Sequence, residues 1–174
     1  PAQRLTSCLC LLHVLTAIGM NGKLPTLTFV DVSRRTVVEI RPFVASDETQ
    51  VIALWRTCAL TRPWNDPSLD IARKLKLNAE WFLVGEESGN IIASAMFGYE
   101  GHRGWVNYLA VHPSYQRKGY ATQLMQYGER LLQAAGCPKL NLQVRSTNAS
   151  TLAFYESLGY KNDEVISLGK RLIS

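Results

Sequence analysis

The sequence predicts a single α/β (α+β) domain whose mixed, mostly antiparallel sheet of six to seven strands is covered by four main helices. Three observations predict this fold class. The chain of 174 residues is 47% apolar and 19% charged, which is typical of one globular domain. Short segments rich in β-branched and apolar residues, separated by turns, lie on either side of two helical patterns in its first two thirds. A long helical pattern and a short alternating segment then follow, as in a strand, crossover helix and parallel strand.

Residues 1–36 are expected to form an N-terminal extension to a main domain at residues 37–174. The apolar run at residues 8–18 is far shorter than the ~20 residues that span a bilayer. It weakly resembles a secretory signal, but no cleavage site follows it. We therefore expect a helix that packs in the core or against a second subunit, beside a strand at residues 26–32, and a homodimer. Met20 is a possible biological start.

The main domain opens with a predicted strand at residues 37–43 and two helices. Ser46 caps the first helix, which runs to about Ala59 with acidic residues in its first turn. The stretch 61–67 carries two prolines and is expected to be a loop. Asp66 and Pro67 then begin a second helix that extends to Asn78.

An antiparallel meander is expected next. Strands at residues 81–85 and 91–96 are joined across Ser88, Gly89 and Asn90, and a third strand covers residues 105–111.

The last third begins with the clearest helix, over residues 119–135, which Gly136 ends. A strand at residues 139–145 is expected to lie parallel to the strand at 105–111, because a crossover helix separates them. Asn148 caps a final helix that ends at Gly159, and residues 165–173 are expected to supply one or two closing strands.

The charge and the cysteines narrow the function. The net charge of +5 is spread along the chain without a basic stripe, so a nucleic-acid partner is not expected. The four cysteines have no metal-ligand spacing, and Cys8 and Cys10 are too close for an ordinary disulfide. We expect no metal site, no membrane partner and a location in the reducing cytoplasm.

The segment with the clearest chemistry is the loop before the long helix. A strand ends in His112-Pro113, and a basic, glycine-containing loop then opens the helix. The first amide groups of a helix have no intrahelical acceptor and lie at the positive end of its dipole, so they bind anions. Gly119 allows a phosphate to approach the backbone. A surface turn with solvated Arg117 and Lys118 explains the local pattern equally well.

A resemblance to a known family decides between these interpretations. Gln116, Gly119 and Ala121 occupy the fixed positions of a loop that resembles the Gln/Arg-x-x-Gly-x-Gly/Ala signature of the GNAT acetyltransferase superfamily. The segment from Asn148 to Tyr155 is similar to a second GNAT motif, in the same order and spacing. Other segments resemble small bacterial YpeA-like acetyltransferases and, at residues 142–148, ribosomal-protein alanine acetyltransferases.

The resemblance implies a GNAT fold, with central strands splayed at the cofactor site, and transfer of an acetyl group from acetyl-CoA (coenzyme A) to an amine. The residues that it implies for cofactor binding are Leu109, Ala110, Val111, Gln116, Arg117, Lys118, Gly119, Tyr120, Ala121, Thr122, Asn148 and Tyr155.

The resemblance also suggests the catalytic groups. Tyr155 matches a tyrosine near the thioester sulfur, where a phenol can donate a proton to the departing thiolate, although a tyrosine there can also be only a core residue. The amide of Leu109 is the first candidate for the oxyanion donor. Asn148 either only caps its helix or also touches the cofactor. Glu100 is the first candidate for the base, His102 and Asp66 are weaker ones, and the reaction can also proceed without a strong base.

The acceptor is expected to be a small amine or an amino acid. Arg62 and Trp64 lie in the loop that covers the acceptor cleft in the family, and Glu100 and His102 complete the predicted substrate residues. A peptide N-terminus is an alternative, but Gln143 stands where the alanine acetyltransferases carry a basic Glu, and Gln cannot take a proton. A coenzyme A-binding module without catalysis is the other alternative.

Overall fold

The computed structural model describes residues 27–31 and 36–172. It divides into two compact units at Asn141, and each unit is described by itself. The predicted N-terminal helix at residues 8–18 lies outside the described residues.

The first unit is built on a mixed sheet whose strands follow chain order, β1 to β6. Neighbours pair antiparallel from β1 to β5, and β5 pairs with β6 in parallel. The predicted meander and the predicted parallel pair are therefore confirmed. The strands are β1 (Leu27–Asp31), β2 (Thr36–Pro42), β3 (Phe82–Glu87), β4 (Asn90–Tyr99), β5 (Gly104–Val111) and β6 (Leu140–Asn141).

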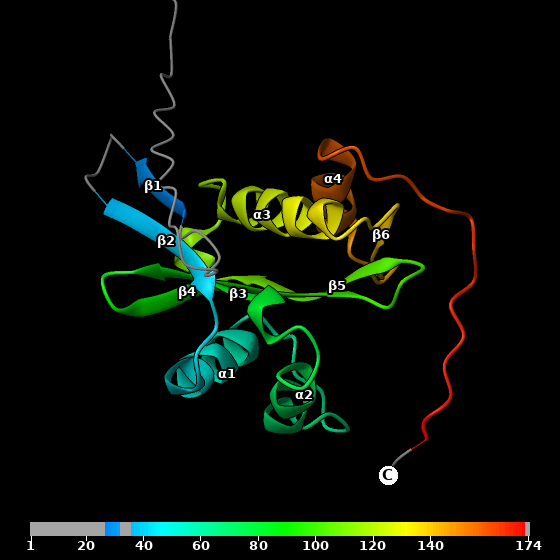
Figure 1. Cartoon of the computed structure of the whole chain (residues 1–174), viewed down its shortest axis with the longest axis horizontal. Coiled ribbons are helices and arrows are strands. Elements are labelled where there is room, and N and C mark those ends of the chain that lie inside the picture. Colours follow the sequence, from blue (N-terminus) through cyan, green and yellow to red (C-terminus); the bar gives the residue numbers. More distant parts are fainter. Residues whose placement is uncertain (1–26, 32–35, 173–174) are drawn as a thin grey trace, which may run out of the picture. The chain divides into compact units, whose positions relative to one another are not determined.

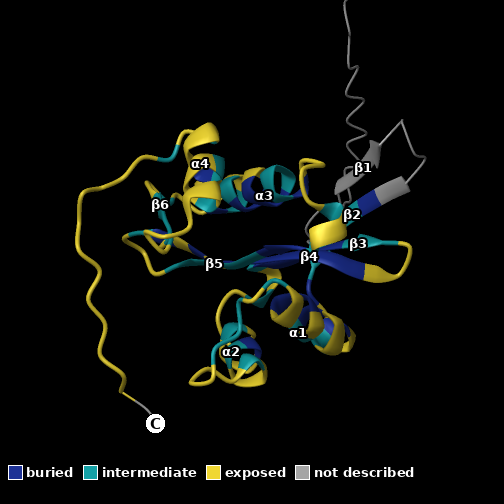
Figure 2. Cartoon of the chain, turned by 180° about the vertical axis from the view of Figure 1, so that it is seen from behind, coloured by how far each residue is buried: buried dark blue, intermediate teal, exposed yellow. Residues whose placement is uncertain are grey.

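Helices cover both faces of this sheet. Helices α1 (Glu48–Thr57) and α2 (Pro67–Lys74) lie on one face, and α3 (Tyr120–Ala134) lies on the other (Figure 1). The predicted helices are confirmed, although α2 ends before the predicted Asn78. The middle strands are buried from both sides, and the helices expose only their outer faces (Figure 2). A sheet covered on both faces explains why β4 is an almost continuous apolar run.

Close packing fixes the position of α3 over the sheet. Gly128 of α3 lies directly on the ring of Phe97, which is 1% exposed, and a Cβ atom at residue 128 would overlap that ring. On the other face, Trp55 of α1 is fully buried and stacks on Phe82 and Tyr108. These contacts fix the positions of α1 and α3 on the two faces of the sheet.

Two expected strand regions are wrong in extent. The strand predicted at residues 139–145 is reduced to Leu140 and Asn141, which pair with Gly104 and Trp105. The rest of β5, to Val111, continues beyond this short pairing. This arrangement is consistent with central strands that separate toward the carboxyl end of β5.

The second unit, from Leu142, contains α4 (Ala149–Ser157) and no strand within its described residues. The closing strands expected at residues 165–173 are not formed as far as residue 172. Val165, Ile166 and Leu168 are more than three quarters exposed there. Apolar alternation alone does not make a strand, because a strand also needs a partner edge.

Candidate active site

The turn after β5 is rigidly built. The amide of His112 donates to the carbonyl of Ile92 at 2.8 Å, and its Nδ1 accepts from the amide of Ser114 at 3.3 Å. Gln116 then turns back, and its Nε2 donates to the carbonyl of Val111 at 3.0 Å. The side chain of Gln116 therefore fixes the loop against the end of the strand.

The backbone of this loop is shaped for close approach. Arg117 and Gly119 both have positive φ, 64° and 85°. The amide of Gln123 donates to the carbonyl of Gly119 at 3.0 Å and begins the hydrogen bonds of α3, so the amides of the first turn have no acceptor within the helix. A Cβ atom on Gly119 would have only Gln123 Nε2 within 4.0 Å, so the space over the loop is open.

These features fit a diphosphate group. Amides of the first turn and the positive end of the α3 dipole attract negative charge, and the 15 residues of α3 give that dipole its full length. Arg117 and Lys118 are exposed on the same loop, with Lys118 Nζ 4.7 Å from the centre of the Tyr115 ring. Residues 116–122 would hold the diphosphate through their backbone and these two cations.

The cofactor residues predicted in the first unit form one continuous path along β5, the loop and the start of α3. The side chain of Tyr120 is buried, so only its backbone can face a ligand. Ala110 and Val111 are likewise buried, which leaves their backbone groups for the same role.

Tyr155 and Asn148 belong to the second unit. Tyr155 is 8% exposed and packs edge-on against Phe154 and Tyr160. Burial raises the pKa of Tyr155 to about 12, so the phenol carries its proton at neutral pH. Asn148 Oδ1 accepts from the amide of Thr151 at 3.2 Å, which confirms the predicted helix cap.

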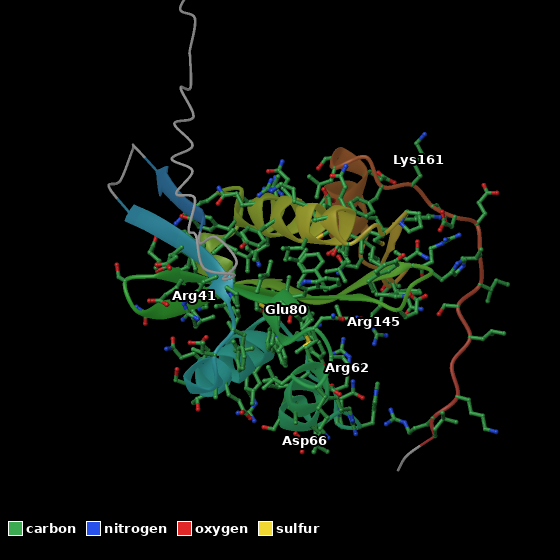
Figure 3. The ribbon with its side chains drawn as sticks, viewed as in Figure 1. Arg41, Arg62, Asp66, Glu80, Arg145 and Lys161 are labelled. Atoms are coloured by element: carbon green, nitrogen blue, oxygen red, sulfur yellow. The ribbon has the colours of Figure 1, made fainter. Side chains whose placement is uncertain are left out.

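The predicted acceptor loop lies between α1 and α2 (Figure 3). Arg62 Nη1 donates to the carbonyls of Ala59 and Thr61, at 2.9 and 3.1 Å, and so closes the end of α1. Trp64 is 58% exposed. Asp66, a weaker candidate for the base, caps α2 through Oδ1, which accepts from the amides of Ser68 and Leu69.

Glu100 and His102 lie in the turn between β4 and β5. Glu100 accepts from the amide of Arg103 at 2.9 Å and from that of His102 at 3.4 Å. These backbone hydrogen bonds, led by the one from Arg103, lower the pKa of Glu100. The turn joins Tyr99 to Gly104, at the opposite end of β5 from the loop. The structure therefore gives Glu100 a role in the turn and makes it a weaker candidate for the base.

Sequence reasoning missed a cluster on the α1–α2 side of β5. Tyr108 donates from its hydroxyl to Asp70 Oδ2 at 2.7 Å, and its ring stacks on Trp55 at 4.0 Å between centroids. Asp70 also pairs with Arg73 at 3.0 Å. Burial, followed by the Asp70 hydrogen bond, raises the pKa of Tyr108 to about 12. No local pattern in the sequence singles out Asp70, because its partner Tyr108 lies 38 positions away.

A shallow cavity of about 320 Å³ lies elsewhere, between α1 and the start of β4. Its lining includes His112 and Tyr115 but none of the four predicted substrate residues. Within the described ranges, no group of three or more His, Cys, Asp or Glu side chains could hold a metal ion. No helix in the described part of the chain is long and apolar enough to cross a membrane.

Comparisons of the sequence with known proteins agree on one family. The model of the acetyltransferase (GNAT) family matches residues 49–160. A protein of Yersinia enterocolitica named as an acetyltransferase is 52% identical over 136 residues, which cover 78% of this chain and 96% of that protein. An uncharacterized N-acetyltransferase of Yersinia pestis is 51% identical over the same length and shares of the two chains.

Solved structures share the fold. An aminoglycoside N-acetyltransferase in complex with CoA superimposes with a TM-score of 0.63 at 17% identity, covering 82% of this chain and 99% of that one. The ribosomal-protein-S18-alanine N-acetyltransferase from Escherichia coli has a TM-score of 0.59 at 23% identity, covering 70% and 76%. The family match spans both the anion loop and the Asn148–Tyr155 motif. The chain therefore belongs to the GNAT family of acetyltransferases, whose acetyl donor is acetyl-CoA.

Proposed function

We propose that this acetyltransferase transfers the acetyl group of acetyl-CoA to the primary amine of a small molecule or amino acid, by direct attack of the amine on the thioester. The observation that carries the proposal is the loop at the start of α3. Gly119 has a positive φ, the surface over the loop is open, and the amides of the first helical turn have no acceptor within the helix. These features suit the diphosphate of coenzyme A.

The residues of β5 would align the thioester. Strand β5 pairs with β6 only through Gly104 and Trp105. The backbone groups on this edge of β5 after Trp105 are therefore available to the extended arm of the cofactor. The Leu109 amide follows the positive φ of Tyr108, and in our proposal it donates to the oxyanion that develops as the amine attacks.

The departing thiolate would take its proton from Tyr155. Because its pKa is raised to about 12, the phenol still carries a proton at neutral pH that it can donate. Asn148 would hold the start of α4 and also face the cofactor. Both assignments rest on the matching family positions.

The acceptor loop supports a small amine. Trp64 offers an exposed aromatic wall beside the two helices on this face. Arg62 would have to leave the carbonyls of Ala59 and Thr61 to bind a substrate carboxylate, so we assign it a weaker part in recognition. Among the fold relatives, named acceptors range from aminoglycosides to a ribosomal-protein alanine, so the fold itself does not choose.

A peptide N-terminus is the alternative acceptor. Gln143 donates from Nε2 to Ser167 Oγ at 2.6 Å. A Gln side-chain amide cannot take a proton from a peptide N-terminus, so Gln143 cannot act as the base there. This favours the small amine as acceptor. A coenzyme A-binding module without catalysis remains the third candidate.

The test is a thiol-release screen with acetyl-CoA against small amines, amino acids, aminoglycosides and peptides. We expect turnover of small amines or amino acids above the hydrolysis background. Turnover confined to peptides would support the alternative acceptor. Normal acetyl-CoA binding without thiol release from any amine would support the non-catalytic module.

The cellular setting remains an expectation. We propose a cytoplasmic homodimer in which residues 1–36 extend the enzymatic domain at residues 37–174. The free Cys58 and Cys137 thiols are consistent with a reducing compartment.

A further inference from the structure

Tyr108 has an unusual backbone for a strand residue. Its φ is 52°, in the left-handed region that tyrosine rarely adopts. The pairing of β4 with β5 shifts register between Ser94 and Met96, which puts Tyr108 at a β-bulge. Strained residues of this kind persist only where their surroundings hold them, and they cluster at functional sites.

The surroundings do hold Tyr108 from several sides. Ser94 Oγ donates to the backbone carbonyl of Tyr108 at 3.3 Å. Ser94 Oγ itself accepts a hydrogen bond from Trp55 Nε1 at 2.9 Å. The ring stacks on Trp55 with an interplanar angle of 21°. The phenol then reaches Asp70 Oδ2 at 2.7 Å. One strand residue is thus tied to both helices of this face.

The phenol also faces the acceptor loop. The side chain of Asn65, between Trp64 and Asp66, is close enough to the phenol to lower its pKa, against the larger effects of burial and Asp70. Leu109, the candidate oxyanion donor, is the next residue in the strand. The hydroxyl of Tyr108 therefore lies on the acceptor side of the sheet, next to the segment that would align the thioester.

We propose that Tyr108 and Asp70 form a proton relay for the acceptor amine. Tyr108 touches the amine and takes its proton, and Asp70 positions the Tyr108 phenol and accepts the phenolic proton. This inference rests on the proposed function and names the base that the reaction uses.

The relay balances the reaction. The amine nitrogen bonds to the carbonyl carbon as the carbon–sulfur bond breaks, and the thiolate leaves with the bonding electron pair. The proton lost by nitrogen passes to Tyr108 Oη while the phenolic proton passes to Asp70 Oδ2. Asp70 then returns one proton to solvent, and the thiolate gains one, so the net products are an amide and a thiol. A raised pKa suits this concerted role, because Tyr108 does not ionise by itself at neutral pH.

The two carboxylates that the sequence suggested as bases already accept backbone hydrogen bonds. Asp66 caps α2, and Glu100 binds the amides of its own turn. Asp70 uses Oδ1 for Arg73 and keeps Oδ2 for Tyr108. The charged group in contact with the phenol is Asp70, which in turn pairs with Arg73 of α2. The other neighbours, Trp55 of α1 and Asn65 of the loop, carry no charge.

The test compares Tyr108→Phe and Asp70→Asn with wild type in the thiol-release assay from pH 6.5 to 9.5, using the best amine from the screen. Phe keeps the stacking on Trp55, and Asn keeps an acceptor oxygen for Tyr108 but cannot take the proton. Tyr99→Phe is the matched control, since it removes a phenol that donates to the carbonyls of Gly101 and Gly136, away from the acceptor loop. Calorimetry with coenzyme A accompanies each variant.

We expect each relay variant to lower kcat about 100-fold at pH 7. The deficit should shrink toward pH 9.5, because hydroxide replaces the missing proton acceptor. Coenzyme A affinity should stay within about twofold of wild type, and Tyr99→Phe should keep full kcat.

Two outcomes would overturn the relay while the proposed function stands: full kcat in Tyr108→Phe, or a loss that is the same at every pH, as a purely structural role would give. Absence of thiol release from wild type with every amine would instead overturn the proposed function, and the relay with it.

Discussion

Arg41 forms the most highly connected ion-pair cluster of described side chains in the first unit. It binds both oxygens of Asp47, at 2.7 and 2.9 Å, and Glu86 Oε2 at 2.7 Å. Burial opposes ionisation of Asp47, but the hydrogen bonds from Arg41 and the Val44 amide outweigh it and lower the pKa of Asp47 below its ordinary 3.8. This cluster ties β2 to β3 and to the turn before α1.

The lowered pKa predicts how stability depends on pH. The unfolded chain binds a proton to Asp47 more tightly, so the contribution of the ion pair is complete above about pH 4 and is lost as the pH falls through the folded pKa. Asp47→Asn should lower the free energy of unfolding by about 2 to 3 kcal/mol at pH 7, and by less at pH 3. Urea unfolding at both values measures this, with the exposed Glu156→Gln as control. Equal losses at both pH values would contradict the argument.

Tyr155→Phe tests the proposed acid. We expect kcat to fall roughly 10- to 100-fold with coenzyme A affinity unchanged, because only proton donation to the thiolate is lost. Since the pKa of Tyr155 is raised to about 12, ionisation of this phenol should not reduce wild-type activity below about pH 10. Steady-state rates beside Tyr99→Phe provide the measurement. Unchanged kcat would assign Tyr155 to the core alone.

At this scale the sequence predicted backbone motifs better than side-chain partners. Gly119 and the Asn148 cap were predicted from the local pattern, and Gln116 from the resemblance to the family signature; the loop geometry and the cap agree with these predictions. The Tyr108–Asp70 pair joins residues 38 positions apart and depends on a bulge, so no local pattern contains it. Glu100 was chosen as a strand-end carboxylate, but the amides of its own turn take it up.

The contact of α3 with the sheet depends on the absence of a side chain at Gly128. Gly128→Ala would force a methyl group into the buried Phe97 ring, which has no room to move. We expect a loss of about 2 kcal/mol in the free energy of unfolding. Gly98→Ala is the matched control, because a Cβ there meets nothing within 4 Å. Urea unfolding of both variants gives the comparison, and an equally stable Gly128→Ala would contradict this packing.

Most elements followed from periodicity, since a long amphipathic helix and short alternating strands are local patterns. Their ends did not. Strand β6 stops at Asn141, and the expected strand at residues 165–173 is absent from the described part of the tail. A strand requires partners that are distant in sequence, and periodicity gives no information about them.

At the scale of the whole molecule, the apolar run at residues 8–18 predicts association. An apolar segment outside a complete domain is stabilised when a second subunit covers it. Light scattering should give a dimer for the full chain and a monomer for a chain that begins at Met20. Dimers from both chains, or monomers from both, would contradict this role of the extension.

The proposed function requires that the backbone at the start of α3 hold the diphosphate of coenzyme A. The most direct measurement is calorimetry of coenzyme A with wild type, Gly119→Glu and Gly136→Glu. Both glycines have positive φ, 85° and 76°, so the two variants share the backbone strain and the added charge, but Gly136 lies at the far end of α3. We predict that wild type and Gly136→Glu bind with similar affinity and that Gly119→Glu binds at least about 100-fold more weakly. Wild type that fails to bind, or equal binding by the two variants, would contradict the account.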